Sequence, residues 1–229
     1  MRKGKKKERK ILKHALIRLL HFIVNPAFCM RTQWAVSKSK GSCLEIGCNI
    51  GHMTEKLLYN KKVSHVIAID IDKKLLKIFK DRFRQQKREI SLVLADAAYL
   101  PFREKAVDTV LLIDVLEHLI KPIKALQEAY RVASTKILIN VPNYDFLNVL
   151  YPNLVPEHYK EPTHVHSTNI RTLKEWLKYI RFTRITMFGS YVPLPLPLIP
   201  LSYFLEYFFK MFQVSPTRFH FQISCEVIL

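Results

Sequence analysis

The sequence Leu44-Glu45-Ile46-Gly47-Cys48-Asn49-Ile50-Gly51 takes an apolar run into a turn with two glycines, and a helical pattern starts directly after it. The run Ser42–Gly47 is predicted to be a strand and His52–Tyr59 a helix. Glycine lets a ligand come close to the backbone, and the amide groups at the start of a helix attract anionic groups. This turn is therefore a candidate ligand-binding turn.

Beyond this turn, short apolar runs alternate with segments of helical periodicity. The further strands expected are His65–Asp70, Ser91–Ala95, Val107–Ile113, Lys136–Val141, Thr183–Phe188 and His220–Ile228, and the further helices expected are Lys73–Gln85, Val115–Val132 and Ile170–Tyr179. Strands that are apolar almost throughout suit a parallel sheet covered on both faces. No convincing helix separates the last two strands. The sequence predicts one α/β domain with a doubly wound, Rossmann-like, mostly parallel sheet and an antiparallel last strand.

Composition indicates a folded protein with an anionic partner. The chain has 229 residues, of which 49% are hydrophobic and 24% charged, and its formal net charge is +18. This excess of positive charge favours phospholipid, phosphate-bearing metabolites or nucleic acid as partners, without choosing among them. The four cysteines form no CxxC pair, which argues against a zinc site and a disulfide framework and fits a reducing compartment.

Two segments depart from the α/β pattern. Residues 1–30 are expected to form a basic amphipathic helix that ends at Pro26, and Arg18 interrupts its apolar face, so we do not expect a cleaved signal peptide. Residues 31–229 are expected to form the main domain, with a long loop at 142–169 and an apolar insertion at 191–216. Prolines and charges break that insertion, so it is expected to lie on a membrane or partner rather than to span a bilayer.

Asp70 indicates the kind of ligand that the turn holds. It ends the second expected strand about 20 residues after the turn, where a carboxylate can accept hydrogen bonds from both hydroxyls of a ribose. A nicotinamide fingerprint would need glycines in place of Asn49 and His52, and no Gly-Lys-Ser/Thr of a P-loop follows the first strand. A nucleoside cofactor other than a dinucleotide is implied.

The segment Leu44–Gly51 resembles the first motif of class I S-adenosylmethionine-dependent methyltransferases of the type 11-like family. The resemblance continues in chain order over roughly Gly41–Tyr179, through Val66–Asp70, Ala95–Phe102, Val107–His118 and Ile137–Asn143. Two positions depart from the family pattern. Asn49 replaces a glycine, but asparagine tolerates left-handed backbone. Ala133-Ser134-Thr135 stands where many relatives have Lys-Pro-Gly-Gly.

The resemblance implies S-adenosylmethionine as cofactor and assigns roles to the matched positions. Glu45 would steady the turn, Asp70 would hold the ribose, Asp96 would take the adenine amino group, and Asp114 would lie at the edge of the crevice. The full set of cofactor-binding residues expected is Glu45, Gly47, Cys48, Asn49, Gly51, Asp70, Ile71, Asp96, Ala97 and Asp114. The expected reaction is in-line displacement at the methyl carbon, for which the protein mainly orients the reactants and excludes water.

Histidines are the candidates for proton transfer, because histidine titrates near neutral pH. We expect His118 and His166 to be catalytic, with His158 and His164 nearby in the long loop. Related quinone and RNA-end methyltransferases hold a divalent metal with a Glu-His pair and later histidines. Glu117, His118, His164 and His166 could imitate that arrangement, but the sequence alone assigns no metal ligand.

The sequence leaves three functions open. The first is methylation of a small-molecule or lipid-like acceptor by a cytoplasmic enzyme attached peripherally to an anionic membrane, indicated by the basic helix and the apolar insertion together. The second is methylation of RNA, suggested by the net charge, although the Asp/Asn-Pro-Pro-Tyr and Pro-Cys motifs of base methyltransferases are missing. The third is a non-catalytic adaptor that binds the cofactor. The oligomeric state is not determined by these features.

Overall fold

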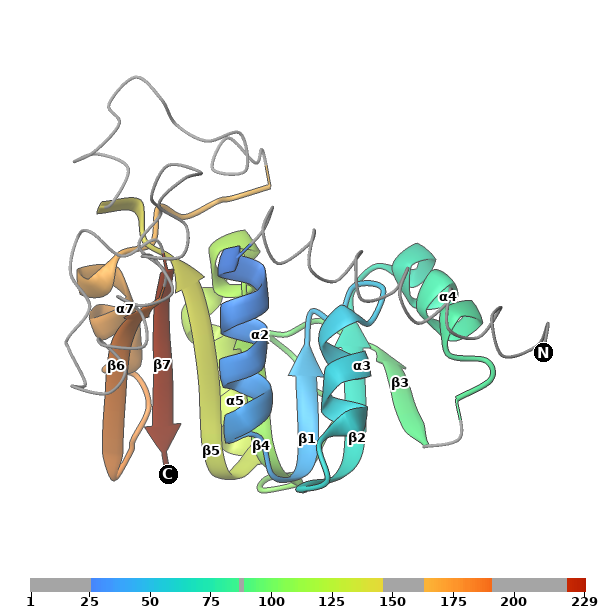
Figure 1. Ribbon diagram of the computed structural model, residues 1–229. Helices are drawn as coiled ribbons and strands as arrows, with labels where there is room; N and C mark the ends of the chain where they lie inside the picture. Colours follow the sequence, from blue (N-terminus) through green and yellow to red (C-terminus); the bar gives the residue numbers. More distant parts are fainter. Residues whose placement is uncertain (1–25, 87–88, 146–162, 191–221) are drawn as a thin grey trace, which may run out of the picture.

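The computed structural model describes residues 26–86, 89–145, 163–190 and 222–229, and these build a seven-stranded sheet in the order β3-β2-β1-β4-β5-β7-β6 (Figure 1). The strands are β1 (Gly41–Ile46), β2 (Val63–Asp70), β3 (Ile90–Leu94), β4 (Val107–Ile113), β5 (Ala133–Pro142), β6 (Arg184–Ser190) and β7 (Gln222–Ile228). Strands β1 to β5 pair in parallel, and β7 runs antiparallel to both β5 and β6. The predicted mostly parallel sheet with an antiparallel last strand is confirmed.

Helices cover both faces of this sheet. The helices α2 (Pro26–Lys38), α3 (His52–Tyr59) and α4 (Lys73–Arg82) lie on one face, and α5 (Pro122–Val132) and α7 (Ile170–Leu177) on the other. Adjacent strand residues point to opposite faces, so Cys43 joins the core under α2 and α3 while Leu44 joins the core under α5. Both residues are fully buried, as expected for a parallel strand covered on both sides.

The single helix predicted over Val115–Val132 is wrong. The structure has a short 3-10 helix, η1 (Leu116–His118), and then a separate helix α5 that begins at Pro122. Proline has no amide hydrogen and clashes with the carbonyl four residues earlier, so it is disfavoured inside a helix and favoured in the first turn. The break leaves Glu117 and His118 on a tight turn at the end of β4, where they take part in the candidate site.

Helix α2 was not predicted. Pro26 was expected to end a helix, whereas in the structure it is the first residue of α2. Trp34 of α2 packs edge-to-face on Phe188 of β6, with ring centroids 5.3 Å apart, so α2 belongs to the folded domain. The basic segment that precedes α2, most of the loop at 142–169 and the apolar insertion at 191–216 lie outside the described residues. Among the helices that are described, none is long and apolar enough to cross a membrane.

Candidate functional site

The turn between β1 and α3 is built from left-handed backbone. Gly47, Asn49 and Gly51 have φ values of 71°, 49° and 85°. A side chain at Gly51 would also collide with the core, because its Cβ would lie 2.5 Å from Cε2 of Phe83. The amide of Cys48 donates to the carbonyl oxygen of Ile69 at 2.9 Å and ties the turn to β2. The predicted tolerance of Asn49 for left-handed backbone is confirmed.

Asp70 closes this turn from the end of β2. Its Oδ2 accepts a hydrogen bond from the amide of Asn49 at 2.8 Å, and its Oδ1 accepts from the amide of Asp72 at 2.9 Å. A carboxylate offers about four acceptor positions, so each oxygen can take one more donor. The side chain is therefore held in place and can still accept the two hydroxyls of a ribose.

Glu45 lies beneath the turn and is buried. Its Oε2 accepts a hydrogen bond from the hydroxyl of Thr54 in α3, which links β1 to the helix after the turn. Burial, reinforced by the nearby charge of Asp70, raises the pKa of Glu45 to about 8, although the Thr54 hydrogen bond opposes the shift. These contacts fit the predicted role of Glu45 in steadying the turn.

The turn after β3 lies beside Asp70, and Ile71, the residue after Asp70, adds an exposed apolar side chain there. The amide of Ala95 donates to the carbonyl oxygen of Asp70 at 3.1 Å, so this turn lies against the end of β2. Asp96 accepts from the amide of Ala98 at 2.8 Å, and Ala97 is buried. Ile71 is 70% exposed. Asp70 is the carboxylate expected to hold a ribose, and an exposed apolar side chain next to it suits the flat face of a purine base.

Asp114 ends β4 with a left-handed backbone, at φ 52°. It forms an ion pair with Arg31 of α2, while its Oδ1 is buried and has no hydrogen-bond partner among the described residues. Burial raises the pKa of Asp114 against the opposing charge of Arg31. Because Arg31 comes from a helix that the sequence did not predict, no local signal marked it as part of this edge.

The predicted histidines separate into two groups. His118 and His164 lie together, with ring centroids 4.5 Å apart. His166 instead has Nε2 3.0 Å from the carbonyl oxygen of Leu119 and packs against Trp176, with ring centroids 5.5 Å apart. His158 lies outside the described residues. The expected catalytic roles of His118 and His166 stay predictions.

Sequence reasoning missed three side chains that complete this edge: Arg31, Thr54 and Tyr144. Thr54 follows Glu45 on the next helix, and its contact depends on how α3 packs on β1. Tyr144 lies in the expected long loop, and its hydroxyl is 2.7 Å from Nδ1 of His164. All three contacts are tertiary, so spacing along the chain does not indicate them.

Comparisons with known proteins agree with this geometry. Residues 44–136 match the family model of the methyltransferase domain. The chain is 36% identical over 85 residues to a probable ribosomal RNA small subunit methyltransferase A of Methanosarcina barkeri, covering 37% of this chain and 29% of that protein. It is 29% identical over 117 residues to a ubiquinone/menaquinone biosynthesis C-methyltransferase of Wigglesworthia glossinidia brevipalpis, covering 47% and 46%. The chain thus spans less than half the length of these curated relatives.

Solved structures share the fold. A SAM-dependent methyltransferase of Thermotoga maritima superposes with a TM-score of 0.63 at 16% identity, covering 94% of this chain and 96% of that one. One from Archaeoglobus fulgidus gives a TM-score of 0.57 at 19% identity, covering 96% and 94%. These identities support the fold alone. The match of residues 44–136 to a methyltransferase domain agrees with the order of the strands and with the turn at the carboxyl edge.

Proposed function

We propose that this protein transfers a methyl group from S-adenosylmethionine to an acceptor. The observation that carries the proposal is the pairing of Asp70 with the left-handed turn, because Asp70 is fixed by the amides of Asn49 and Asp72 and keeps acceptor capacity for a ribose. The turn, Asp70 and the segment after β4 all lie at the carboxyl ends of parallel strands, where open α/β sheets bind ligands.

The cofactor would supply an activated methyl group on sulfur. An electron pair of the acceptor would form the new bond to the methyl carbon as the carbon–sulfur bond breaks and the demethylated thioether leaves. The chain would contribute orientation, exclusion of water and a place for the acceptor proton. Val115 places the segment after β4 beside the cofactor turn, because a Cβ added at Gly47 would lie 2.7 Å from Cγ2 of Val115. The acceptor would therefore approach from the side of Asp114 and His118.

The acceptor that we propose is a small or lipid-like molecule, met at an anionic membrane surface. Likeness to a quinone C-methyltransferase supports a lipid-like acceptor. Membrane attachment is supported by the sequence of two segments outside the described residues, the basic stretch before α2 and the apolar insertion at 191–216.

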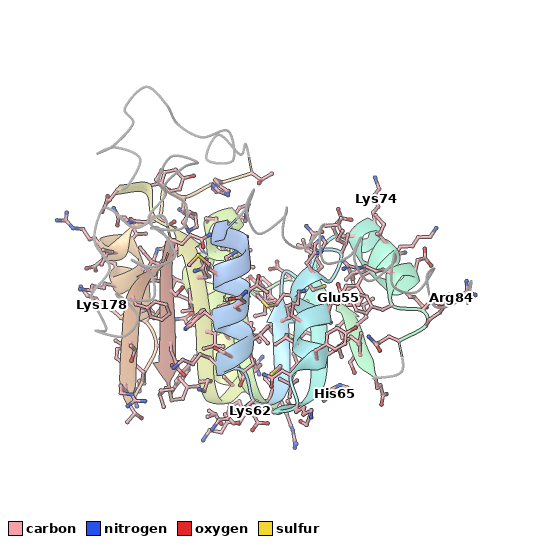
Figure 2. All side chains as sticks on the ribbon, in the orientation of Figure 1. Glu55, Lys62, His65, Lys74, Arg84 and Lys178 are labelled. Carbon is pink, nitrogen blue, oxygen red and sulfur yellow. The ribbon has the colours of Figure 1, made fainter. Side chains whose placement is uncertain are left out.

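Methylation of RNA is the second candidate. The ribosomal RNA methyltransferase of Methanosarcina barkeri is 36% identical over its matched region, and basic side chains lie along α4. Figure 2 shows Lys74 and Arg84 pointing away from the fold near α4. A row of exposed basic residues is the usual footprint of phosphate-backbone contacts.

The cofactor site is tested by calorimetry with S-adenosylmethionine and its demethylated product. Asp70→Ala removes a charged acceptor worth about 1.5–3 kcal/mol per hydrogen bond, so affinity is expected to fall at least tenfold. Asp81→Ala, which removes an exposed carboxylate from α4, is the matched control and should bind as the wild type does. Unchanged affinity in a folded Asp70→Ala protein would contradict the site.

A further inference from the structure

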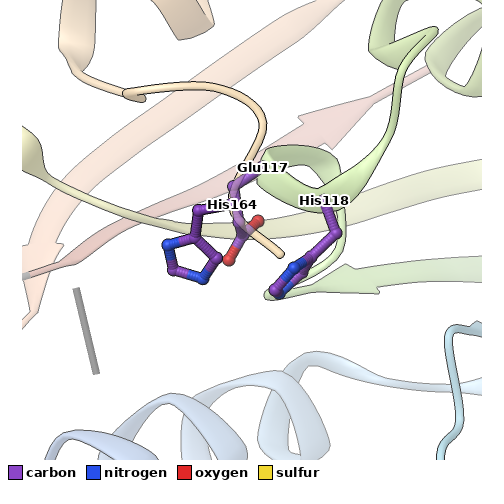
Figure 3. Close-up of side chains that lie close together, drawn as sticks. All are labelled: Glu117, His118 and His164. Carbon is purple, nitrogen blue, oxygen red and sulfur yellow. The ribbon is translucent and has the colours of Figure 1, made fainter. Parts of the chain in front are cut away.

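Glu117 and His118 of η1 and His164 of the long loop gather into one cluster beyond the carboxyl end of β4. One ligand-type atom from each side chain lies within 4.8 Å of the other two. Figure 3 shows the carboxylate of Glu117 between the two imidazole rings in this view. Ligand atoms of a tetrahedral zinc ion lie about 3.4 Å from one another, so modest side-chain rotations would bring all three onto one ion.

Main-chain hydrogen bonds hold the two parts of the cluster together. The carbonyl oxygen of Glu117 accepts from the amides of Val165 at 2.8 Å and His166 at 3.1 Å. The ring of His166 adds a contact at 3.0 Å between its Nε2 and the carbonyl oxygen of Leu119. His164 is therefore fixed against η1 by the backbone on its carboxyl side, and the cluster does not depend on the chance position of a surface side chain.

Each histidine has a partner that orients its ring. Nδ1 of His118 lies 3.2 Å from the carbonyl oxygen of Thr163. The hydroxyl of Thr163 lies closer, 3.0 Å from the same Nδ1, so both contacts engage Nδ1 and Nε2 is the nitrogen that can face an ion. Nδ1 of His164 lies 2.7 Å from the hydroxyl of Tyr144, which engages that nitrogen in the same way. Such outer contacts are typical of histidines that bind metal through the other nitrogen.

The buried carboxylate of Glu117 also favours a bound cation at this edge. Glu117 is 1% exposed, and its Oε2 has no hydrogen-bond partner within the described part of the chain. Arg31 forms an ion pair with the neighbouring carboxylate of Asp114. A buried carboxylate oxygen without a partner is costly, and a bound cation would remove that cost.

We propose that Glu117, His118 and His164 bind a divalent first-row transition-metal ion. Two imidazoles and one carboxylate form a ligand set that suits ions from Mn²⁺ to Zn²⁺. Three protein ligands leave at least one coordination position open. If the chain is the methyltransferase proposed above, that position would take an oxygen of the acceptor, so His118 would act on the acceptor through the ion rather than as a free base.

The test is metal binding by the untagged full-length protein, freed of metal with a chelator and titrated with Zn²⁺, Mn²⁺ and Co²⁺. We expect one ion per chain and, with Co²⁺, visible absorption bands from bound imidazole. His164→Ala and Glu117→Gln should each weaken binding by about 100-fold, and Tyr144→Phe by about 10-fold through the orienting contact. His65→Ala is the matched control, because this histidine lies on β2 near the opposite end of the sheet (Figure 2).

Equal binding by the wild type, His164→Ala and Glu117→Gln, with all three folded by thermal unfolding, would overturn the proposal, and so would no binding at all. Calorimetry with S-adenosylmethionine on the same samples separates the two proposals. A protein that binds the nucleoside and no metal ion contradicts the metal site alone. A protein that binds the metal ion and no nucleoside contradicts the proposed function alone.

Discussion

At the scale of single residues, the carboxyl edge of the sheet concentrates buried acids. Glu45, Asp70 and Glu117 are buried, and the side chain of Asp114 is 22% exposed. Asp70 is compensated by two backbone amides and Asp114 by Arg31, whereas Glu45 has the hydroxyl of Thr54. Burial favours the neutral form of an acid, so the environment of each group decides how much its ionisation costs the fold.

Glu45 makes the stability of the fold depend on pH. Its pKa is about 8 in the folded protein and near the ordinary value of 4.5 when unfolded. Between these values the folded state holds a proton that the unfolded state has lost, so this contribution is complete below about pH 4.5 and is lost as pH rises toward 8. The free energy of unfolding should fall by up to about 1.4 kcal/mol per pH unit across this window.

Glu45→Gln keeps the shape of the side chain and removes its titrating carboxyl group. Urea unfolding at several pH values between 5 and 8 should therefore give a flatter profile for Glu45→Gln than for the wild type. Other buried acids titrate in both proteins, so the difference between the two profiles isolates Glu45. Parallel profiles would show that Glu45 is ionised in the folded state.

At the scale of elements, the stability of the turn between β1 and α3 depends on which residue type stands at each left-handed position. Gly51→Ala combines a φ of 85° with a Cβ that would lie 2.5 Å from Phe83 and 2.6 Å from Phe79. Asn49→Gly keeps the φ of 49° accessible and loses only the hydrogen bond from the Ile50 amide to its Oδ1. We expect Gly51→Ala to cost at least about 2 kcal/mol and Asn49→Gly less than about 1 kcal/mol.

Chemical denaturation of the two variants measures this difference. Circular dichroism of the native state serves as the control, since both variants should keep the secondary structure of the wild type. Equal stability of Gly51→Ala and the wild type would show that α3 can shift away from Phe79 and Phe83, and the close packing of the turn would then not be required.

The sequence predicts elements well where the signal is local. Near-continuous apolar runs predict the strands, and glycines predict the turn, because strand burial and backbone freedom are properties of a few neighbouring residues. Pro122 indicates a break in the helix, but the apolar periodicity on both sides of it favours one continuous helix. The ion pair of Arg31 and the contact between Tyr144 and His164 join segments far apart in the chain, so only the fold places them.

At the scale of the whole molecule, charge is the property that the fold alone does not explain. The chain carries a net charge of +18, and nine of its Lys and Arg residues fall in the first 21 residues against one Glu. A methyltransferase domain needs no such excess to bind its cofactor. The excess is expected to act on the approach to a partner, either an anionic membrane or an RNA.

Flotation with liposomes distinguishes these partners. Each Lys or Arg near an anionic surface contributes about 1 kcal/mol, so the full chain should float with anionic liposomes and not with neutral ones. Removal of residues 1–24 should abolish most of this binding and spare the fold, because the deletion stops before α2, which packs on β6 through Trp34 and Phe188. The control is the double variant Lys74→Ala and Lys77→Ala, which removes two exposed charges from α4 and should change flotation little.

Salt then separates charge from apolar insertion. Charges in water are screened over about 10 Å at 0.1 M salt, so the electrostatic part of the binding should weaken steeply as salt is added. Apolar side chains buried among lipid headgroups and chains are not screened, so a salt-resistant remainder is expected from the insertion at 191–216. RNA binding would instead be lost almost completely at high salt, because it depends on phosphate contacts. Equal and negligible flotation of the full and shortened chains, with retention on RNA at low salt, would replace the membrane with RNA as the partner of the basic segment.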